Sequence, residues 1–147
     1  MFVLDLNEYI RQIKNFDYAF TKIDVPYNPE NFPSEYAIGK DLDIFVSQKD
    51  FEKINFFTAK YFSKYKMFNL KILTKQNNYR LRMEKNKKLH FQIDITCNDE
   101  MIKEKIEKNN YFILSFNNEK KIRLMELCKN PNKRHHRDWL IKNKVIK

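Results

Sequence analysis

The stretch Tyr36-Ala-Ile-Gly-Lys-Asp-Leu-Asp-Ile-Phe-Val46 decides the fold of this chain. Two acids, Asp41 and Asp43, open an otherwise apolar run, and the only glycine of the protein, Gly39, stands two residues before them. Because side chains alternate between the two faces of a strand, the two acids point to one face and the apolar residues to the other. Burying such a pair is costly unless a cation offsets its charge. The stretch therefore predicts a strand that holds a divalent metal.

Length and composition predict a single α/β domain over residues 1–147. The chain has the size of one ordinary domain, and 42% of its residues are hydrophobic. The net charge is 29 − 19 = +10, which favours anionic partners such as nucleotides or phosphorylated sugars. Scattered lysines also make an ordinary solvated surface, so nucleic acid is the less favoured partner.

A single glycine excludes several phosphate-binding loops. Dinucleotide loops, P-loops and kinase loops all require two or more glycines within a few residues. Phosphate must therefore be bound by side chains, helix N-termini or a metal. Cys97 and Cys128 are too few for a disulfide framework, and the sequence contains no apolar run of about 18 residues. The N-terminal residues are not expected to act as a secretory signal, because no basic region precedes a long apolar core. We expect a cytoplasmic protein without a membrane partner.

Hydrophobic periodicity predicts a mixed or antiparallel sheet that is flanked by helices, with further helices at the C-terminus. Ser47 is expected to cap the second helix, and the segment 111–116 is ambiguous between a strand and a buried segment. A loop with three prolines covers 24–35. The expected helices are 5–15, 48–66, 100–108, 119–128 and 138–145, and the expected strands are 16–23, 41–46, 68–75, 79–84 and 88–96.

A third acid, Asp94, lies inside the alternating strand 88–96, where aspartate is unusual. The preceding strand carries Arg80 and Arg82. A hairpin turn at 85–87 would place Arg80 opposite Gln92 and diagonal to Asp94. If Asp94 converges with the acid pair of the first stretch, the three carboxylates suit Mg²⁺, which prefers oxygen ligands. The alternative is that Asp94 only pairs with Arg80 and that no metal binds.

Residues 39–46, Gly-Lys-Asp-Leu-Asp-Ile-Phe-Val, and residues 91–95, Phe-Gln-Ile-Asp-Ile, resemble the nucleotidyltransferase superfamily that includes DNA polymerase beta. The resemblance covers a core over residues 1–97, and a helical, basic part follows over 98–147. It implies that Asp41, Asp43 and Asp94 are catalytic residues and hold two Mg²⁺ ions, or Mn²⁺ in their place, against a nucleoside triphosphate.

The chain departs from this family at one motif. The family has Gly-Ser shortly after the first strand to hold the triphosphate, and residues 21–40 contain no Gly-Ser. A subset associated with bacterial surface-polysaccharide loci is more similar, because a basic residue ends the first strand there. On that resemblance the nucleotide and phosphate ligands are Lys22, Gly39, Lys40, Arg80 and Arg82.

The sequence thus indicates a metal-dependent nucleotidyltransferase, which moves a nucleotidyl group from a nucleoside triphosphate to a hydroxyl of a small molecule, sugar or protein. The alternative is an inert relative that binds an anionic ligand or nucleic acid through its basic surface. A third possibility is an interaction module whose basic C-terminal segment binds an acidic partner. His135 and His136 are interpreted as part of a solvated basic turn.

Overall fold

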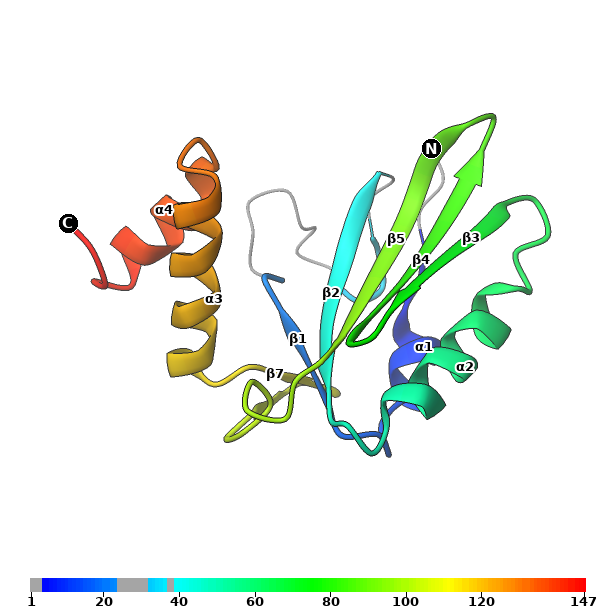
Figure 1. The fold of residues 1–147 in the computed structure, drawn as a ribbon, viewed down its shortest axis with the longest axis horizontal. Coiled ribbons are helices and arrows are strands. Elements are labelled where there is room, and N and C mark those ends of the chain that lie inside the picture. The colour runs from blue at the N-terminus through cyan, green and yellow to red at the C-terminus, as the bar shows by residue number, and fades with distance from the viewer. Residues whose placement is uncertain (1–3, 24–31, 37–38) are drawn as a thin grey trace.

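The fold is a seven-stranded sheet with helices on both sides (Figure 1), seen in a computed structural model that describes residues 4–23, 32–36 and 39–147. Most of the expected proline loop lies outside these residues. No helix within the described ranges is long and apolar enough to cross a membrane. The elements are α1 (Asn7–Gln12), β1 (Tyr18–Thr21), β2 (Lys40–Val46), α2 (Phe51–Phe62), β3 (Asn69–Lys75), β4 (Asn78–Lys85), β5 (Lys88–Cys97), β6 (Ile106–Lys108), β7 (Tyr111–Ile113), α3 (Phe116–Lys129) and α4 (Arg134–Lys142).

The strands follow the order β3-β4-β5-β2-β1-β7-β6. β2 runs parallel to β5 and β1 runs parallel to β7, whereas the other neighbours are antiparallel. The predicted α/β class, with a mixed sheet, flanking helices and C-terminal helices, is therefore confirmed. It fits the α+β arrangement that the resemblance to nucleotidyltransferases implies.

The main core lies between the sheet and the pair α1 and α2. Leu42, Ile44 and Val46 of β2 are almost completely buried, as the alternation of this strand predicts. Phe62 of α2 packs against Phe91 of β5, with ring centroids 5.5 Å apart. Figure 1 shows α3 and α4 on the opposite side of the sheet from α1 and α2. The polar side chains of β2 and β5 therefore face α3.

The predicted helix over 100–108 is wrong. Residues 99–104 form turns, and β6 follows and pairs with β7 in a hairpin at the edge of the sheet. Glu104 and Asn109 adopt φ values of 57° and 56°, which interrupt a right-handed helix. Ile102 is buried from a turn instead of from a helix face. The ambiguous segment 111–116 contains the strand β7 and the start of α3.

The predicted cap of the second helix is also wrong. α2 begins at Phe51, and its N-cap residue is Asp50 instead of Ser47. The carboxylate of Asp50 accepts a hydrogen bond of 2.8 Å from the backbone N–H of Asp17, which ties the start of α2 to the start of β1. The tertiary contact of Asp50 thus replaces the local capping box.

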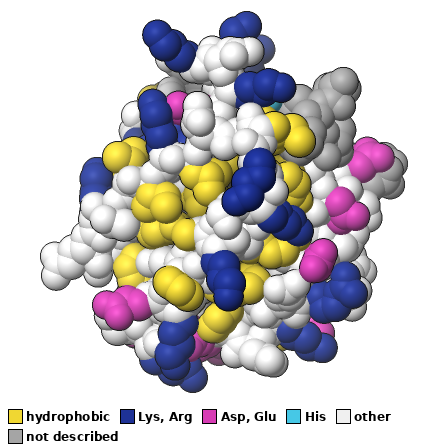
Figure 2. All heavy atoms as spheres, turned by 90° about the vertical axis from the view of Figure 1, so that its right-hand side faces the viewer, with side chains coloured by type: hydrophobic (Ala, Val, Ile, Leu, Met, Phe, Trp, Pro, Cys, Tyr) yellow, Lys and Arg dark blue, Asp and Glu magenta, His cyan; other side chains and the backbone are white. Residues whose placement is uncertain are grey.

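Hydrophobic side chains gather among lysines and arginines on the side of the molecule that Figure 2 shows, which includes α2 and β3. The exposed hydrophobic residues of these two elements are Phe56, Ile72 and Leu73. β3 is an edge strand of the sheet, and its lysines Lys71 and Lys75 are exposed. Lysines on an edge strand disfavour pairing with a second chain.

Candidate active site

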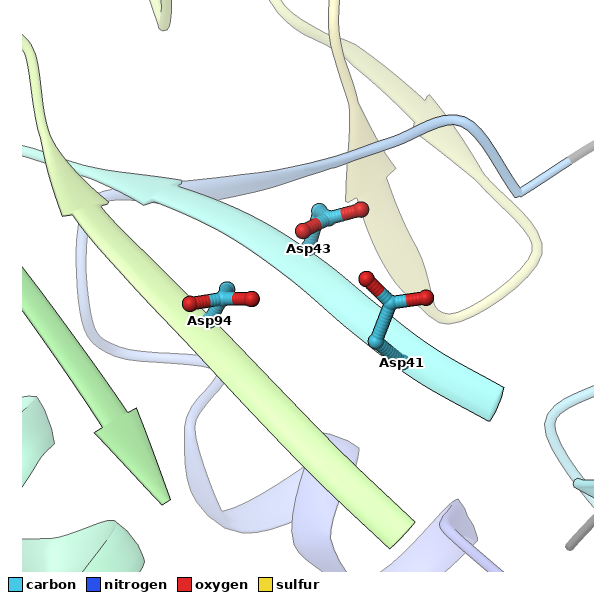
Figure 3. Close-up of side chains that lie close together, drawn as sticks. All are labelled: Asp41, Asp43 and Asp94. Atoms are coloured by element: carbon cyan, nitrogen blue, oxygen red, sulfur yellow. The ribbon is translucent and has the colours of Figure 1, made fainter. Parts of the chain in front are cut away.

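Three carboxylates lie together on the face of the sheet that is turned toward α3. Asp43 of β2 and Asp94 of β5 are register partners in neighbouring parallel strands, and Asp41 stands two residues earlier on the same face of β2. One oxygen of each carboxylate lies within 4.8 Å of the others. Figure 3 shows the three side chains projecting on the same side of β2 and β5. The structure thus brings together the three acids that the sequence singled out.

A β-bulge sets the partner of Asp94. The register of β4 and β5 shifts between Met83 and Glu84, so that His90 is the extra residue of β5. Arg80 therefore lies directly opposite Asp94, and its predicted position opposite Gln92 is wrong. The guanidinium Nε of Arg80 donates a 2.9 Å hydrogen bond to Oδ1 of Asp94.

Gln92 binds the second oxygen of the same carboxylate. Its amide Nε2 donates a 2.9 Å hydrogen bond to Oδ2 of Asp94. The Asp94 side chain is 11% exposed, so these two donors offset much of the cost of burying it. Each carboxylate oxygen has a second lone pair for a further partner. Arg80 and Gln92 thus fix the orientation of the Asp94 carboxylate, and each of its oxygens can still accept one further partner.

Lys22 enters the site from the end of β1. Its ammonium Nζ lies 3.0 Å from Oδ2 of Asp43 and 3.5 Å from Oε1 of Glu126 on α3. The backbone φ of Lys22 is 57°, which is uncommon for a residue other than glycine. The sequence placed Lys22 among the phosphate ligands, and the structure shows it as the ion-pair partner of a carboxylate in the cluster.

Glu119 of α3 holds the backbone of Lys22. Oε1 of Glu119 accepts a 2.9 Å hydrogen bond from the Lys22 N–H, and Oε2 accepts a 2.7 Å hydrogen bond from the hydroxyl of Thr21. The fully buried Arg123 also donates from Nε to Oε1 at 3.0 Å. Glu119 and Glu126 were not among the site residues that the sequence predicted. Their spacing of seven residues, two helical turns, places both on one face of the expected helix, and this was the available signal.

The electrostatics of the cluster are dominated by burial. Burial and the charges of Asp41 and Asp94 raise the pKa of Asp43, the charge of Lys22 lowers it, and the net result is a pKa of about 6. Burial lowers the pKa of Lys22, but the charge of Asp43 and its hydrogen bond outweigh this, so that the pKa of Lys22 is raised overall. The ion pair of Lys22 and Asp43 therefore holds both groups in their charged forms near neutral pH.

The carboxylates lie in a cleft of about 530 Å³ between the sheet and α3. The sheet contributes the acids, together with Arg80 and several neutral polar side chains. The opposite wall is formed by Ile122, Met125, Glu126 and Lys129 of α3, and Lys133 follows that helix. The basic C-terminal part of the chain therefore forms one wall of the site.

The donor set fits a hard divalent cation. Three carboxylates supply only oxygen ligands, which Mg²⁺ and Mn²⁺ prefer. The acids of the cluster and Glu126 bring four negative charges to the lining of the cleft, and Lys22, Arg80, Lys129 and Lys133 bring four positive charges. The charges of the cleft lining therefore balance, whereas the whole chain has a net charge of +10.

The remaining predicted ligands lie elsewhere or are not described. The backbone N–H of Gly39 donates a 2.7 Å hydrogen bond to the carbonyl of His90, which extends the pairing of β2 with β5. The Nε of Arg82 lies 3.5 Å from a carboxylate oxygen of Glu84. Neither Gly39 nor Arg82 lines the cleft. The side chain of Lys40 lies outside the described part of the chain, so its contact with phosphate stays a prediction.

The interpretation of His136 as part of a solvated turn is wrong. His136 is 1% exposed and lies in the first turn of α4, where its Nδ1 is 3.4 Å from Nη1 of Arg123. Burial, together with the charges of His135 and Arg123, lowers the pKa of His136 to about 4. This neutral imidazole belongs to the contact between α3 and α4.

No protein-family model and no curated protein matches the sequence. Among solved structures, the chain is similar to the Megavirus polyadenylate synthase, with a TM-score of 0.42 and 12% sequence identity. The similarity covers 94% of this chain and 28% of the synthase. A similarity of this size carries no argument about function. The function is therefore inferred from the carboxylate site itself.

Proposed function

We propose that the protein is a metal-dependent nucleotidyltransferase that moves a nucleotidyl group from a nucleoside triphosphate to a hydroxyl of a small molecule, sugar or protein. The observation that carries the proposal is the convergence of Asp41, Asp43 and Asp94 within 4.8 Å in an open cleft. The resemblance of the sequence around these acids to nucleotidyltransferases supports it. The proposal treats residues 1–147 as a single nucleotidyltransferase-like domain.

Asp41, Asp43 and Asp94 would hold the divalent cation, with Mg²⁺ as the expected ion, two ions as the expected number and Mn²⁺ as a substitute. When bound, such ions neutralise phosphate charge and favour the ionised form of an attacking hydroxyl. Lys22 and Arg80 line the same cleft, which supports a role for these two cations in contacting phosphate oxygens. Lys129 and Lys133 add positive charge at the opposite wall.

The proposed reaction is an in-line displacement at the α-phosphorus of the triphosphate. The acceptor oxygen forms a bond to this phosphorus, the bond from the phosphorus to the β-phosphate oxygen breaks, and pyrophosphate leaves. Asp94 accepts the proton of the acceptor hydroxyl at a carboxylate oxygen. Arg80 and Gln92 keep that carboxylate in one orientation during the transfer, which favours reaction by fixing the geometry.

Calorimetry with Mg²⁺ and each of the four nucleoside triphosphates tests the proposal. We expect binding of at least one triphosphate that requires Mg²⁺ and that Asp43→Asn abolishes. Glu84→Gln is the matched control, because Glu84 is a comparably buried acid on β4 outside the cleft. The proposal fails if no triphosphate binds, or if both variants bind like the wild type.

A second candidate is an inert relative that binds an anionic ligand or nucleic acid. One observation favours it: Lys22 already neutralises Asp43, and both oxygens of Asp94 accept hydrogen bonds from protein donors. This candidate predicts binding that weakens with salt and survives Asp43→Asn. Gel-shift titrations with RNA and DNA at two salt concentrations distinguish it from the first proposal.

A further inference from the structure

The ammonium of Lys22 lies between carboxylates on two different elements. Asp43 belongs to the sheet and Glu126 belongs to α3, and they lie 3.0 Å and 3.5 Å from Nζ. All three side chains are between 19% and 24% exposed, so the contacts are shielded from water over most of their surface. Removing one partner from a partly buried ion pair costs more free energy than removing one partner from an exposed surface pair.

The backbone of Lys22 is fixed by α3. Glu119 accepts a hydrogen bond from the Lys22 N–H, and it also binds Thr21 and Arg123. Because the peptide is held at this point, the ammonium can change its partner through side-chain torsions alone. The two available carboxylates are then Asp43 and Glu126.

The second carboxylate has room for the ammonium. Oε2 of Glu126 lies 3.4 Å from Nζ of Lys133, whereas Oε1 is the oxygen near Lys22. Glu126 thus presents a separate oxygen to each lysine. If the Lys22 ammonium leaves Asp43, the carboxylate of Glu126 still balances its positive charge inside the cleft. The free-energy cost of an unpaired, partly buried ammonium is therefore avoided.

On the basis of the proposed function, we propose that Lys22 is the counter-ion of Asp43 in the metal-free protein and that it moves to Glu126 when a divalent cation binds the three carboxylates. Glu126 is then a positioning residue that assists metal binding by accepting the displaced ammonium. No covalent bond changes in this exchange. The released Lys22 remains in the cleft, where a phosphate oxygen can share it with Glu126.

Mn²⁺ binding, measured by electron paramagnetic resonance on the full chain at pH 8, tests the exchange. We expect Lys22→Met to bind Mn²⁺ about tenfold more tightly than the wild type, because a cation within about 4 Å of the site opposes binding. Lys71→Met is the matched control, since Lys71 forms a 3.0 Å ion pair with Glu84 outside the cleft. Its affinity for Mn²⁺ should equal that of the wild type.

A double-mutant cycle tests the role of Glu126. Glu126→Gln should weaken Mn²⁺ binding several-fold in the wild-type background, because the displaced ammonium loses its acceptor. The same substitution should have little effect when Lys22 is already methionine. If Glu126 acted only as a distant negative charge, its loss would weaken binding equally in both backgrounds, and that result would overturn the proposal.

The outcomes separate this inference from the proposed function. If the wild type binds Mn²⁺ in a manner that needs Asp43, but Lys22→Met leaves the affinity unchanged, the exchange is wrong and the metal site stands. If neither the wild type nor Lys22→Met binds Mn²⁺, both ideas fail. Lys22→Gln serves as a second neutral variant, and circular dichroism establishes that each variant is folded.

Discussion

Arg80 and Asp94 face each other directly across β4 and β5, and Nε of the guanidinium lies 2.9 Å from Oδ1 of the carboxylate. This pairing exists because the bulge at His90 moves every later residue of β5 by one position relative to β4. Without the bulge, Arg80 would lie opposite Ile93 and would share a face of the sheet with that apolar side chain instead of with Asp94. One extra residue thus sets the charge environment of the site.

Arg80→Met should destabilise the metal-free protein by about 1–2 kcal/mol, because the buried carboxylate of Asp94 loses its charged donor and keeps only Gln92. Urea denaturation in EDTA measures the effect. Arg82→Met is the control, since Arg82 lies 3.5 Å from Glu84, which also pairs with a lysine. Equal losses in the two variants would show that the pair of Arg80 and Asp94 has no special role.

The contribution of Asp43 to the free energy of unfolding of the metal-free protein should decrease as the pH rises. Burial raises its pKa from 3.8 to about 6, so between these values the folded protein holds a proton that the unfolded chain has lost. Stability from this group therefore falls between pH 4 and 6, by on the order of 2 kcal/mol. Asp43→Asn should gain stability relative to the wild type over this interval, as measured by thermal unfolding in EDTA. Parallel profiles for the two proteins would contradict the prediction.

The carboxylate cluster could be predicted from the sequence because it follows from local patterns. The period of two in β2 places Asp41 and Asp43 on one face, and the same period places Asp94 on one face of β5. The parallel pairing that aligns Asp43 with Asp94 is a long-range contact, and the family resemblance implied only that the three acids share one metal site. The sequence thus predicted the face of the strand on which each acid lies, but it did not predict the register between β2 and β5.

The partner of Asp94 and the wall of the cleft could not be predicted in the same way. The hairpin of β4 and β5 turns at Asn86 and Lys87, both with positive φ, and a lysine gives no signal for such a conformation. The bulge at His90 has no sequence signal either. The contact of Glu119 with Lys22 joins residues 97 positions apart, and it depends on how α3 packs on the sheet.

His136 should oppose the effect of Asp43 in the same pH range. Burial lowers its pKa from 6.5 to about 4, so between these values the unfolded chain binds a proton that the folded protein does not. Stability from this group is therefore lost as the pH falls from 6.5 to 4. His136→Asn keeps a hydrogen-bond acceptor for Arg123 and should gain stability relative to the wild type toward pH 4. Thermal unfolding measures this difference, and a constant difference across the interval would contradict the prediction.

Gly39→Ala should destabilise the protein by about 1–2 kcal/mol, because φ at this position is +80°, where a Cβ is strained. The nearest heavy atom to an added Cβ is the carbonyl oxygen of Leu89 at 4.0 Å, so steric crowding contributes nothing. Gly39→Asn should cost less, since asparagine tolerates positive φ better than alanine. Urea denaturation that ranks alanine as the milder change would contradict this account.

Glu119→Ala should destabilise the protein by about 3–5 kcal/mol, because the fully buried guanidinium of Arg123 would lose the carboxylate that it contacts at 3.0 Å. The same substitution removes the acceptor of the Lys22 N–H and of the Thr21 hydroxyl. Glu119→Gln keeps an oxygen acceptor and should cost less than alanine. Glu107→Ala, at an exposed position of β6, is the control, and urea denaturation measures all three variants. A loss for Glu119→Ala no larger than that of the control would show that α3 holds the end of β1 without this carboxylate.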